Sequence, residues 1–217
     1  LRDEIEADCE LNLITLKDKE ALSVIRHSAS HVLAEAVKRV FPEAKLAIGP
    51  SIAEGFYYDF DHEPFSREDL DKLEAEMKKI IKEGAHIEKF ELPREEAIKF
   101  MEEKNEPYKV ELIKDLPEGE KISFYKQGDF TDLCAGPHLQ RTKDIKAFKL
   151  ISSSMAYWRG DSNKAKLQRI YGTAYNSKEE LEAHLKHLED IKLWKRSRKE
   201  TIISSVGKWN FSPRLML

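Results

Sequence analysis

The sequence is short of cysteine, of net charge and of long apolar runs, and each shortage excludes a class of protein. Only Cys9 and Cys134 occur among 217 residues, so no disulfide framework is expected and a reducing compartment is the default. The 37 basic residues nearly balance the 40 acidic ones, so any nucleic-acid contact has to be a local patch. No apolar run approaches the ~20 residues of a membrane span, and no signal-peptide pattern opens the chain. We therefore expect a soluble, cytoplasmic protein and, because the chain begins at Leu1 in mid-pattern, a segment of a longer one.

Several catalytic motifs are also absent. There is no GxxxxGK[ST] phosphate loop, no GxGxxG dinucleotide turn and no GxSxG nucleophile elbow. His27 and His31 form an HxxxH pair, as in zinc proteases, but Ser28 stands where those enzymes carry their catalytic glutamate. This difference argues against a metalloprotease.

Hydrophobic periodicity predicts helices and strands mixed without a regular βαβ alternation. Helices are expected at about 18–40, 66–83, 93–104 and from 177 onward, the second and the last opened by capping-box signatures. Strands are expected at about 11–16, 44–48, 55–60, 86–91, 108–113, 121–126, 130–134, 147–158 and 167–171. The predicted fold class is α+β, a mainly antiparallel sheet packed with helices that include a central HxxxH helix.

The predicted helix over 18–40 carries its histidines on an unusual face. Residues four apart on a helix lie one turn apart on the same side, so His27 and His31 address one point. They lie roughly opposite the main apolar stripe, among small and neutral residues, whereas a solvated face would carry Lys and Glu. We expect this helix to be covered on two sides, with its histidines lining a pocket.

A second pair, Cys134 and His138, spans a Gly-Pro turn much later in the chain. Together with the first pair it offers one thiol and three imidazoles, a set that suits a tetrahedral metal site or a metal-free polar pocket. Each of the four residues alone is equally consistent with a satisfied core or surface residue, and spacing leaves these alternatives open. The other histidines show no such pairing: His62, His86, His184 and His187.

Six short motifs follow one another in a fixed order. They are IRHSASH (25–31), AIGP (47–50), GFYYD (55–59), PYKV (107–110), TDLCAGPH (131–138) and AYWRGDSNKAKLQRIY (156–171). Together they resemble the N-terminal editing domain of bacterial-type threonyl-tRNA synthetase, over about residues 20–190.

The flanks fit that resemblance unequally. Residues 1–19 resemble the tail of the small ubiquitin-like (TGS) domain that precedes the editing domain in the family. Residues 191–217 correspond to a linker helix and tail, but 201–217 depart from the family, as a shifted reading frame near residue 194 would produce. We expect that tail to be poorly ordered. The basic run 194–199 suits either a solvated helix end or a contact with tRNA phosphates.

The resemblance implies an editing activity. A synthetase site for threonine cannot strongly exclude serine, because one methyl group is worth only about 1–3 kcal/mol of discrimination. The implied reaction is hydrolysis of seryl-tRNA(Thr) after transfer, and the implied partners are the 3′ end of tRNA(Thr) carrying serine and the remainder of a homodimeric synthetase, with no membrane. The ATP-binding catalytic core is absent from this chain, so we do not expect it to charge tRNA.

The resemblance also implies the catalytic residues. Ester hydrolysis needs an oriented water, a group that moves its proton and charge stabilisation for the oxyanion. His27 and Lys109 would position and activate the water or steady the developing charge. Asp132 would hold the amino group of the serine.

Five further residues would bind the substrate. His31, Cys134 and His138 would shape the pocket, while Tyr58 and Tyr125 would pack against the terminal adenosine. No cofactor is required for this editing reaction.

Zinc on His27, His31, Cys134 and His138, as in free-standing alanyl-tRNA editing proteins, stays an open alternative. Two other functions also stay open: a free-standing editing factor for seryl- or glycyl-tRNA(Ala), and a zinc-stabilised tRNA-binding module without hydrolysis.

Overall fold

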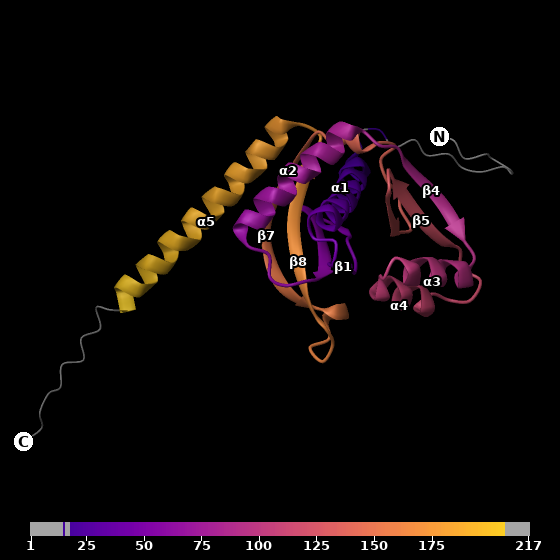
Figure 1. The fold of residues 1–217 in the computed structure, drawn as a ribbon. Helices are drawn as coiled ribbons and strands as arrows, with labels where there is room; N and C mark the ends of the chain where they lie inside the picture. Colours follow the sequence, from indigo (N-terminus) through magenta and orange to yellow (C-terminus); the bar gives the residue numbers. More distant parts are fainter. Residues whose placement is uncertain (1–14, 16–17, 207–217) are drawn as a thin grey trace, which may run out of the picture. The chain divides into compact units, whose positions relative to one another are not determined.

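The structure is a computed structural model that describes residues 15 and 18–206 (Figure 1). The chain divides into two compact units, Leu1–Ser177 and Lys178–Leu217. The second unit contains the long helix α5 (Lys178–Val206). Within the described part of the chain, no helix combines the length and the apolar composition that crossing a bilayer requires.

The first unit mixes helices with antiparallel strands, which confirms the α+β prediction. Its α-helices are α1 (Lys19–Val40), α2 (Arg67–Glu83), α3 (Arg94–Glu103) and α4 (Pro107–Asp115). Its strands are β1 (Lys45–Leu46), β2 (Ser51–Ile52), β3 (Gly55–Asp61), β4 (Ile87–Leu92), β5 (Ile122–Gln127), β6 (Phe130–Leu133), β7 (Ala147–Tyr157) and β8 (Lys166–Tyr175). Two short 3₁₀ helices are η1 (Thr142–Asp144) and η2 (Trp158–Gly160).

Helices α1 and α2 pack on the larger sheet, whose strands follow the order β1–β3–β8–β7 with β2 paired to β3 (Figure 1). The side chains of Phe56, Tyr58 and Phe60 alternate with polar ones along β3 and are fully buried, as a strand with one core face requires. They form one hydrophobic core with the apolar stripe of α1, including Ile25 and Leu33. The alternation predicted for this strand is confirmed.

A smaller sheet, β4–β5–β6, forms a second core with α3 and α4. Phe124 of β5 is fully buried there against Met101 of α3 and Ile113 of α4. Figure 1 shows α3 and α4 side by side next to this sheet. The described part of the unit thus has two main cores and a small third cluster of Ala47, Trp158 and Leu167. Strand β6 contributes to both main cores, because Phe130 packs in the larger one with α1 and Leu133 packs against the second.

Local sequence explains where α2 begins and ends. The hydroxyl oxygen of Ser66 accepts the N–H of Asp69 at 3.1 Å, and the Asp69 carboxylate accepts the N–H of Ser66 at 3.0 Å. Gly84 ends the helix in the left-handed conformation at φ +71°, where a side chain would be strained. The predicted capping box is confirmed.

The strand predicted at 108–113 is wrong, because these residues form helix α4. Their apolar residues alternate over a few positions, which suits a strand, but Pro107 occupies the first helical turn, where its fixed φ favours a helix. Burial of Val110 and Ile113, three residues apart, then selects the helical period.

Two other expectations concern the ends of the chain. Helix α5 continues through residues 201–206, part of the tail that was expected to be poorly ordered. The strand predicted at 11–16 lies almost wholly outside the described residues, as does the rest of that tail.

Candidate functional site

The two histidines of α1 lie on one face of the helix and close to each other, as the helical spacing predicts. The ring centroids of His27 and His31 lie 5.2 Å apart. His31 is only 4% exposed, whereas His27 is partly open to solvent. The opposite side of α1 is buried in the larger core through Ile25, Ala29 and Val32, so the helix is covered on two sides.

The loop after β6 brings Cys134 and His138 to these histidines. The Cys134 sulfur lies 3.3 Å from His27 Nε2 and 3.2 Å from His138 Nε2. Ligand atoms of His27, His31, Cys134 and His138 all lie within 4.8 Å of one another. The two sequence pairs therefore form one cluster that could hold a metal ion.

Gly136 makes this close approach feasible. It adopts φ +79°, a conformation that residues with a side chain rarely adopt, and a Cβ there would lie 2.1 Å from the Tyr125 hydroxyl oxygen. Tyr125 in turn contacts His138 edge to face, with ring centroids 4.4 Å apart. The glycine thus lets the loop fold tightly over Tyr125 and place His138 against α1.

Asp132 is the centre of a buried polar group next to the histidines. Its Oδ1 lies 2.6 Å from Lys109 Nζ, and its Oδ2 accepts a hydrogen bond from the Tyr58 hydroxyl at 2.6 Å. His31 Nε2 lies 3.8 Å from Oδ2. The side chains of Asp132 and Lys109 are at most 3% exposed, so each charge depends on the other for its compensation.

Burial sets the protonation of the cluster. Burial lowers the pKa of His27 and His138, and it lowers that of His31 well below its usual value. Electrostatic repulsion from His27 and Lys109 lowers the pKa of His31 further. Burial also raises the pKa of the Cys134 thiol to about 11. Without a metal, the imidazoles are therefore neutral and the thiol is protonated at neutral pH.

A cavity of about 460 Å³ opens beside His27. It is lined by Glu20, Ser23, Val24, His27, Pro50, Ser51, Gly136 and Pro137. Neither Tyr58 nor Tyr125 lines this cavity. Tyr58 is fully buried, and its hydroxyl donates to Asp132. His27 is thus the member of the cluster through which a ligand in the cavity meets the buried groups.

All eight residues predicted for the site lie together in the structure. They are His27, His31, Tyr58, Lys109, Tyr125, Asp132, Cys134 and His138. Sequence reasoning missed the contacts of Ser28, Gly136 and Pro137, although Gly136 and Pro137 lie inside the quoted TDLCAGPH motif and Ser28 inside IRHSASH.

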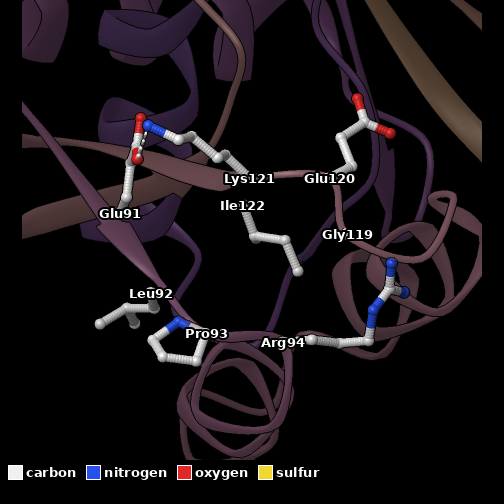
Figure 2. A pocket seen from close by; sticks show the side chains of 8 residues that line it. All are labelled: Glu91, Leu92, Pro93, Arg94, Gly119, Glu120, Lys121 and Ile122. Atoms are coloured by element: carbon white, nitrogen blue, oxygen red, sulfur yellow. Dashed lines mark ion pairs between the residues drawn. The ribbon is translucent and has the colours of Figure 1, made fainter.

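A different cavity, of about 370 Å³, lies at the rim of the smaller sheet (Figure 2). Three of its charged side chains are engaged within the fold, because Arg94 donates to the carbonyl of Leu116 at 2.7 Å and Lys121 pairs with Glu91 at 3.6 Å. None of the eight residues lines it.

The site draws on both cores of the unit. His27 and His31 come from α1, whereas Asp132 and Cys134 follow β5 in the smaller sheet and Lys109 comes from α4. Gln127 of β5 ties the two parts together by donating to Glu35 of α1 at 2.7 Å. The site thus joins α1 to the smaller sheet and α4.

The sequence around this site matches a known protein family. Residues 122–171 match the family described as threonyl and alanyl tRNA synthetase second additional domain, and this range contains Asp132, Cys134 and His138. Over this range the chain is similar to the additional domain of threonyl and alanyl tRNA synthetases.

Similar proteins with curated names include several threonine–tRNA ligases. The chain is 64% identical over 189 residues to the threonine–tRNA ligase of Acetivibrio thermocellus, and 61% identical over 189 residues to that of Clostridioides difficile. Each alignment covers 87% of this chain and 30% of the relative. With that of Clostridium tetani the identity is 63% over 193 residues, 88% of this chain and again 30% of the relative. The chain spans about 30% of the length of these relatives, and in this segment it belongs to the threonine–tRNA ligase family.

Proposed function

We propose that this chain is a post-transfer editing domain that hydrolyses the ester of seryl-tRNA(Thr) to serine and tRNA(Thr). The observation that carries the proposal is the buried Lys109–Asp132 ion pair, which lies next to His31 and acts electrostatically on His27, the histidine that faces the cavity. Such a charged pair is costly to bury. The neighbouring histidines His27 and His31, whose pKa values burial lowers, are the kind of perturbed groups that functional sites contain.

The chemistry assigns a role to each group. His27 lies at the cavity and is neutral, so it can orient a water and accept its proton. Lys109 supplies the positive charge that steadies the oxyanion, and Asp132 holds the amino group of the serine. The Tyr58 hydroxyl keeps the Asp132 carboxylate in position.

The remaining residues form the walls. His31 and His138 pack against His27 with ring centroids 5.2 and 4.3 Å from it, His31 edge to face and His138 tilted, which restricts the orientation of its imidazole. Cys134 closes the cluster at hydrogen-bond distance from two of these rings. Tyr125 supports His138, and its packing against a terminal adenosine belongs to this proposal.

The proposal extends to the partners. The domain would act on the 3′ end of tRNA(Thr) carrying serine, as part of a homodimeric, cytoplasmic synthetase whose ATP-dependent core lies outside this chain. Residues 20–190 would be the editing domain, 1–19 the end of a TGS domain and 191–217 a linker helix with a divergent tail.

The cluster also fits zinc. In a tetrahedral zinc site with Zn–S near 2.3 Å and Zn–N near 2.0 Å, the ligand atoms lie about 3.3–3.6 Å apart. Around Cys134 the sulfur-to-nitrogen distances are 3.2 and 3.3 Å, at or just below the lower end of this range, and all four ligand atoms lie within 4.8 Å of one another, so the side chains would shift slightly to hold the ion. His27, His31, Cys134 and His138 would hold the ion, which supplies positive charge to the pocket.

This fit favours one alternative function. A zinc ion held by all four side chains has no free position for the hydrolytic water, as in structural zinc sites. The chain would then be a zinc-stabilised tRNA-binding module. The matched family also includes alanyl-type domains, so an editing factor for mischarged tRNA(Ala) is the other alternative.

A time course of seryl- against threonyl-tRNA(Thr) hydrolysis by this chain tests the proposal. We expect the seryl ester to be cleaved and the threonyl ester to survive. Loss of a general base typically costs about 10²–10⁴-fold, so His27→Ala should lose most of the activity, and Lys109→Ala likewise.

Two exposed residues provide matched controls. His86→Ala removes an exposed imidazole, and Lys114→Ala removes an exposed ammonium from the same helix as Lys109. Both should retain the wild-type rate. Wild-type rates in His27→Ala and Lys109→Ala would contradict the proposal, and selective cleavage of mischarged tRNA(Ala) would favour the alanyl-type alternative.

A further inference from the structure

Ser28 touches the cluster from behind and has no role in the proposed reaction so far. Its side chain is fully buried in α1, between the two histidine turns. Its hydroxyl oxygen lies 2.9 Å from the backbone N of Leu139 and 3.3 Å from His138 Nδ1. A hydroxyl has one hydrogen to donate and lone pairs to accept with, so these two contacts can be assigned a direction.

The direction follows from what each partner can do. A backbone N–H only donates, so Leu139 donates to the Ser28 oxygen. The hydrogen of Ser28 can then be donated to His138 Nδ1, and in that arrangement Nδ1 is the acceptor. A neutral imidazole carries one proton, so His138 carries its proton on Nε2.

Hydrogen-bond directions at the Cys134 thiol follow in the same way. His138 Nε2–H points at the Cys134 sulfur 3.2 Å away, and the N–H of Gly136 also donates to that sulfur at 3.2 Å. The sulfur thus accepts twice, and its own hydrogen is directed to His27 Nε2 at 3.3 Å. His27 then carries its proton on Nδ1, the nitrogen left to donate to the Pro137 carbonyl, with which this imidazole is hydrogen-bonded.

We propose that Ser28 is a positioning residue that fixes the tautomer of His138 and, through Cys134, that of His27. The hydrogen bonds run in one direction, from the Leu139 amide through Ser28, His138, Cys134 and His27 to the Pro137 carbonyl. This order leaves Nε2 of His27 as its proton-accepting nitrogen. Only this last consequence rests on the proposed function, since the tautomers exist with or without hydrolysis.

A histidine tautomer can be observed directly. Long-range ¹H–¹⁵N correlation spectra of the chelator-treated, ¹⁵N-labelled chain distinguish the protonated from the unprotonated ring nitrogen. We expect His138 protonated on Nε2 and His27 protonated on Nδ1. A His138 protonated on Nδ1 in the wild-type chain would overturn the proposal, whatever the behaviour of any variant.

Variants at two serines of α1 separate positioning from packing. Ser28→Ala should lose the single His138 tautomer, and Ser28→Thr, which keeps the hydroxyl, should restore it. The control is Ser30→Ala, because Ser30 is equally buried but its hydroxyl lies within hydrogen-bond distance of the carbonyls of His27 and Gly49, between which its single hydrogen is donated or shared. An unchanged His138 tautomer in Ser28→Ala would show that Ser28 only packs.

Hydrolysis provides a second readout. Residues that orient a reacting histidine typically contribute about 10–100-fold, so Ser28→Ala should lower kcat by that factor with KM unchanged. Ser28→Thr should recover kcat. If the wild-type chain hydrolyses no seryl ester at all, the proposed function fails while the tautomer result still decides the role of Ser28.

Discussion

Replacing Lys109 with methionine tests whether the site is built on a buried ion pair. Lys109→Met keeps the length of the side chain and its apolar stem but removes the charge 2.6 Å from Asp132. Asp132 is 2% exposed and would then be a buried carboxylate without a cation, although the Tyr58 hydroxyl still donates to it. The folded state should lose stability well beyond one ordinary hydrogen bond.

The expected magnitude follows from the burial of both partners. Breaking a buried pair by removing one ion costs about 3–5 kcal/mol, because the other charge stays uncompensated. For a protein of this size, each kcal/mol lowers the melting temperature by about 2–4 °C, so a fall of about 6–20 °C is expected. Replacing both ions, in Lys109→Met with Asp132→Asn, should recover much of the loss because no charge is left buried.

Urea unfolding followed by circular dichroism measures these differences. Lys79→Met is the matched control, because Lys79 and Glu76 lie 2.7 Å apart but the Lys79 side chain is 69% exposed. Surface pairs contribute about 0–1 kcal/mol, so this control should change little. If Lys109→Met costs no more than Lys79→Met, Asp132 and Lys109 do not form a desolvated pair and the account of the site is wrong.

Three further substitutions or additions have defined outcomes. Gly136→Ala should lower thermal stability and disrupt the cluster, since its Cβ would collide with the Tyr125 hydroxyl; a melting temperature equal to wild type would show that the loop relaxes freely. Asp69, whose pKa is lowered to about 2 by its hydrogen bonds to Ser66, contributes stability that is present above its usual pKa of 3.8 and lost as the pH falls toward 2. Asp69→Asn should therefore make the free energy of unfolding depend less on pH in that window. An unchanged pH dependence would show that Asp69 does not contribute to acid sensitivity. Zn²⁺ at a hundredfold excess over its dissociation constant should raise the unfolding free energy of the chelator-treated chain by about 2.7 kcal/mol and release the Cys134 proton, whereas Cys134→Ser should show neither effect at the same concentration.

Those parts of the fold that are encoded locally could be predicted from the sequence. The cap of α2 depends on Ser66 and Asp69 three residues apart, and both the residues and their spacing are visible in the chain. Helix α4 was missed because the short run from Tyr108 to Ile113 satisfies the strand and the helix period alike. The choice between them was made by Pro107 and by packing against the smaller sheet.

The site also combines features that local sequence encodes with features that depend on distant residues. The pairing of histidines on α1 follows from helical spacing, and the meeting of His27 with Cys134 was a reasoned hypothesis. The hydrogen bond between Tyr58 and Asp132 joins residues 74 positions apart on different sheets, and no local pattern specifies it. The burial of Lys109 depends on α4 being a helix, which sequence reasoning had wrong. Position alone gave Ser28 no role, since its partners lie 110 and 111 residues away.

These long sequence separations also bear on how the pocket comes into being on the ribosome. The histidines of α1 are made early, but Cys134, their hydrogen-bonding partner, follows 107 residues after His27. At translation rates of about 5–20 residues per second, His27 waits about 5–20 s for that partner to be synthesised. During this interval Cys134 and His138, which pack against the histidine face of α1, have not yet been synthesised. The nascent chain therefore carries exposed imidazoles that neighbouring chains and free metal ions can reach, and that window closes only when the loop after β6 has left the exit tunnel.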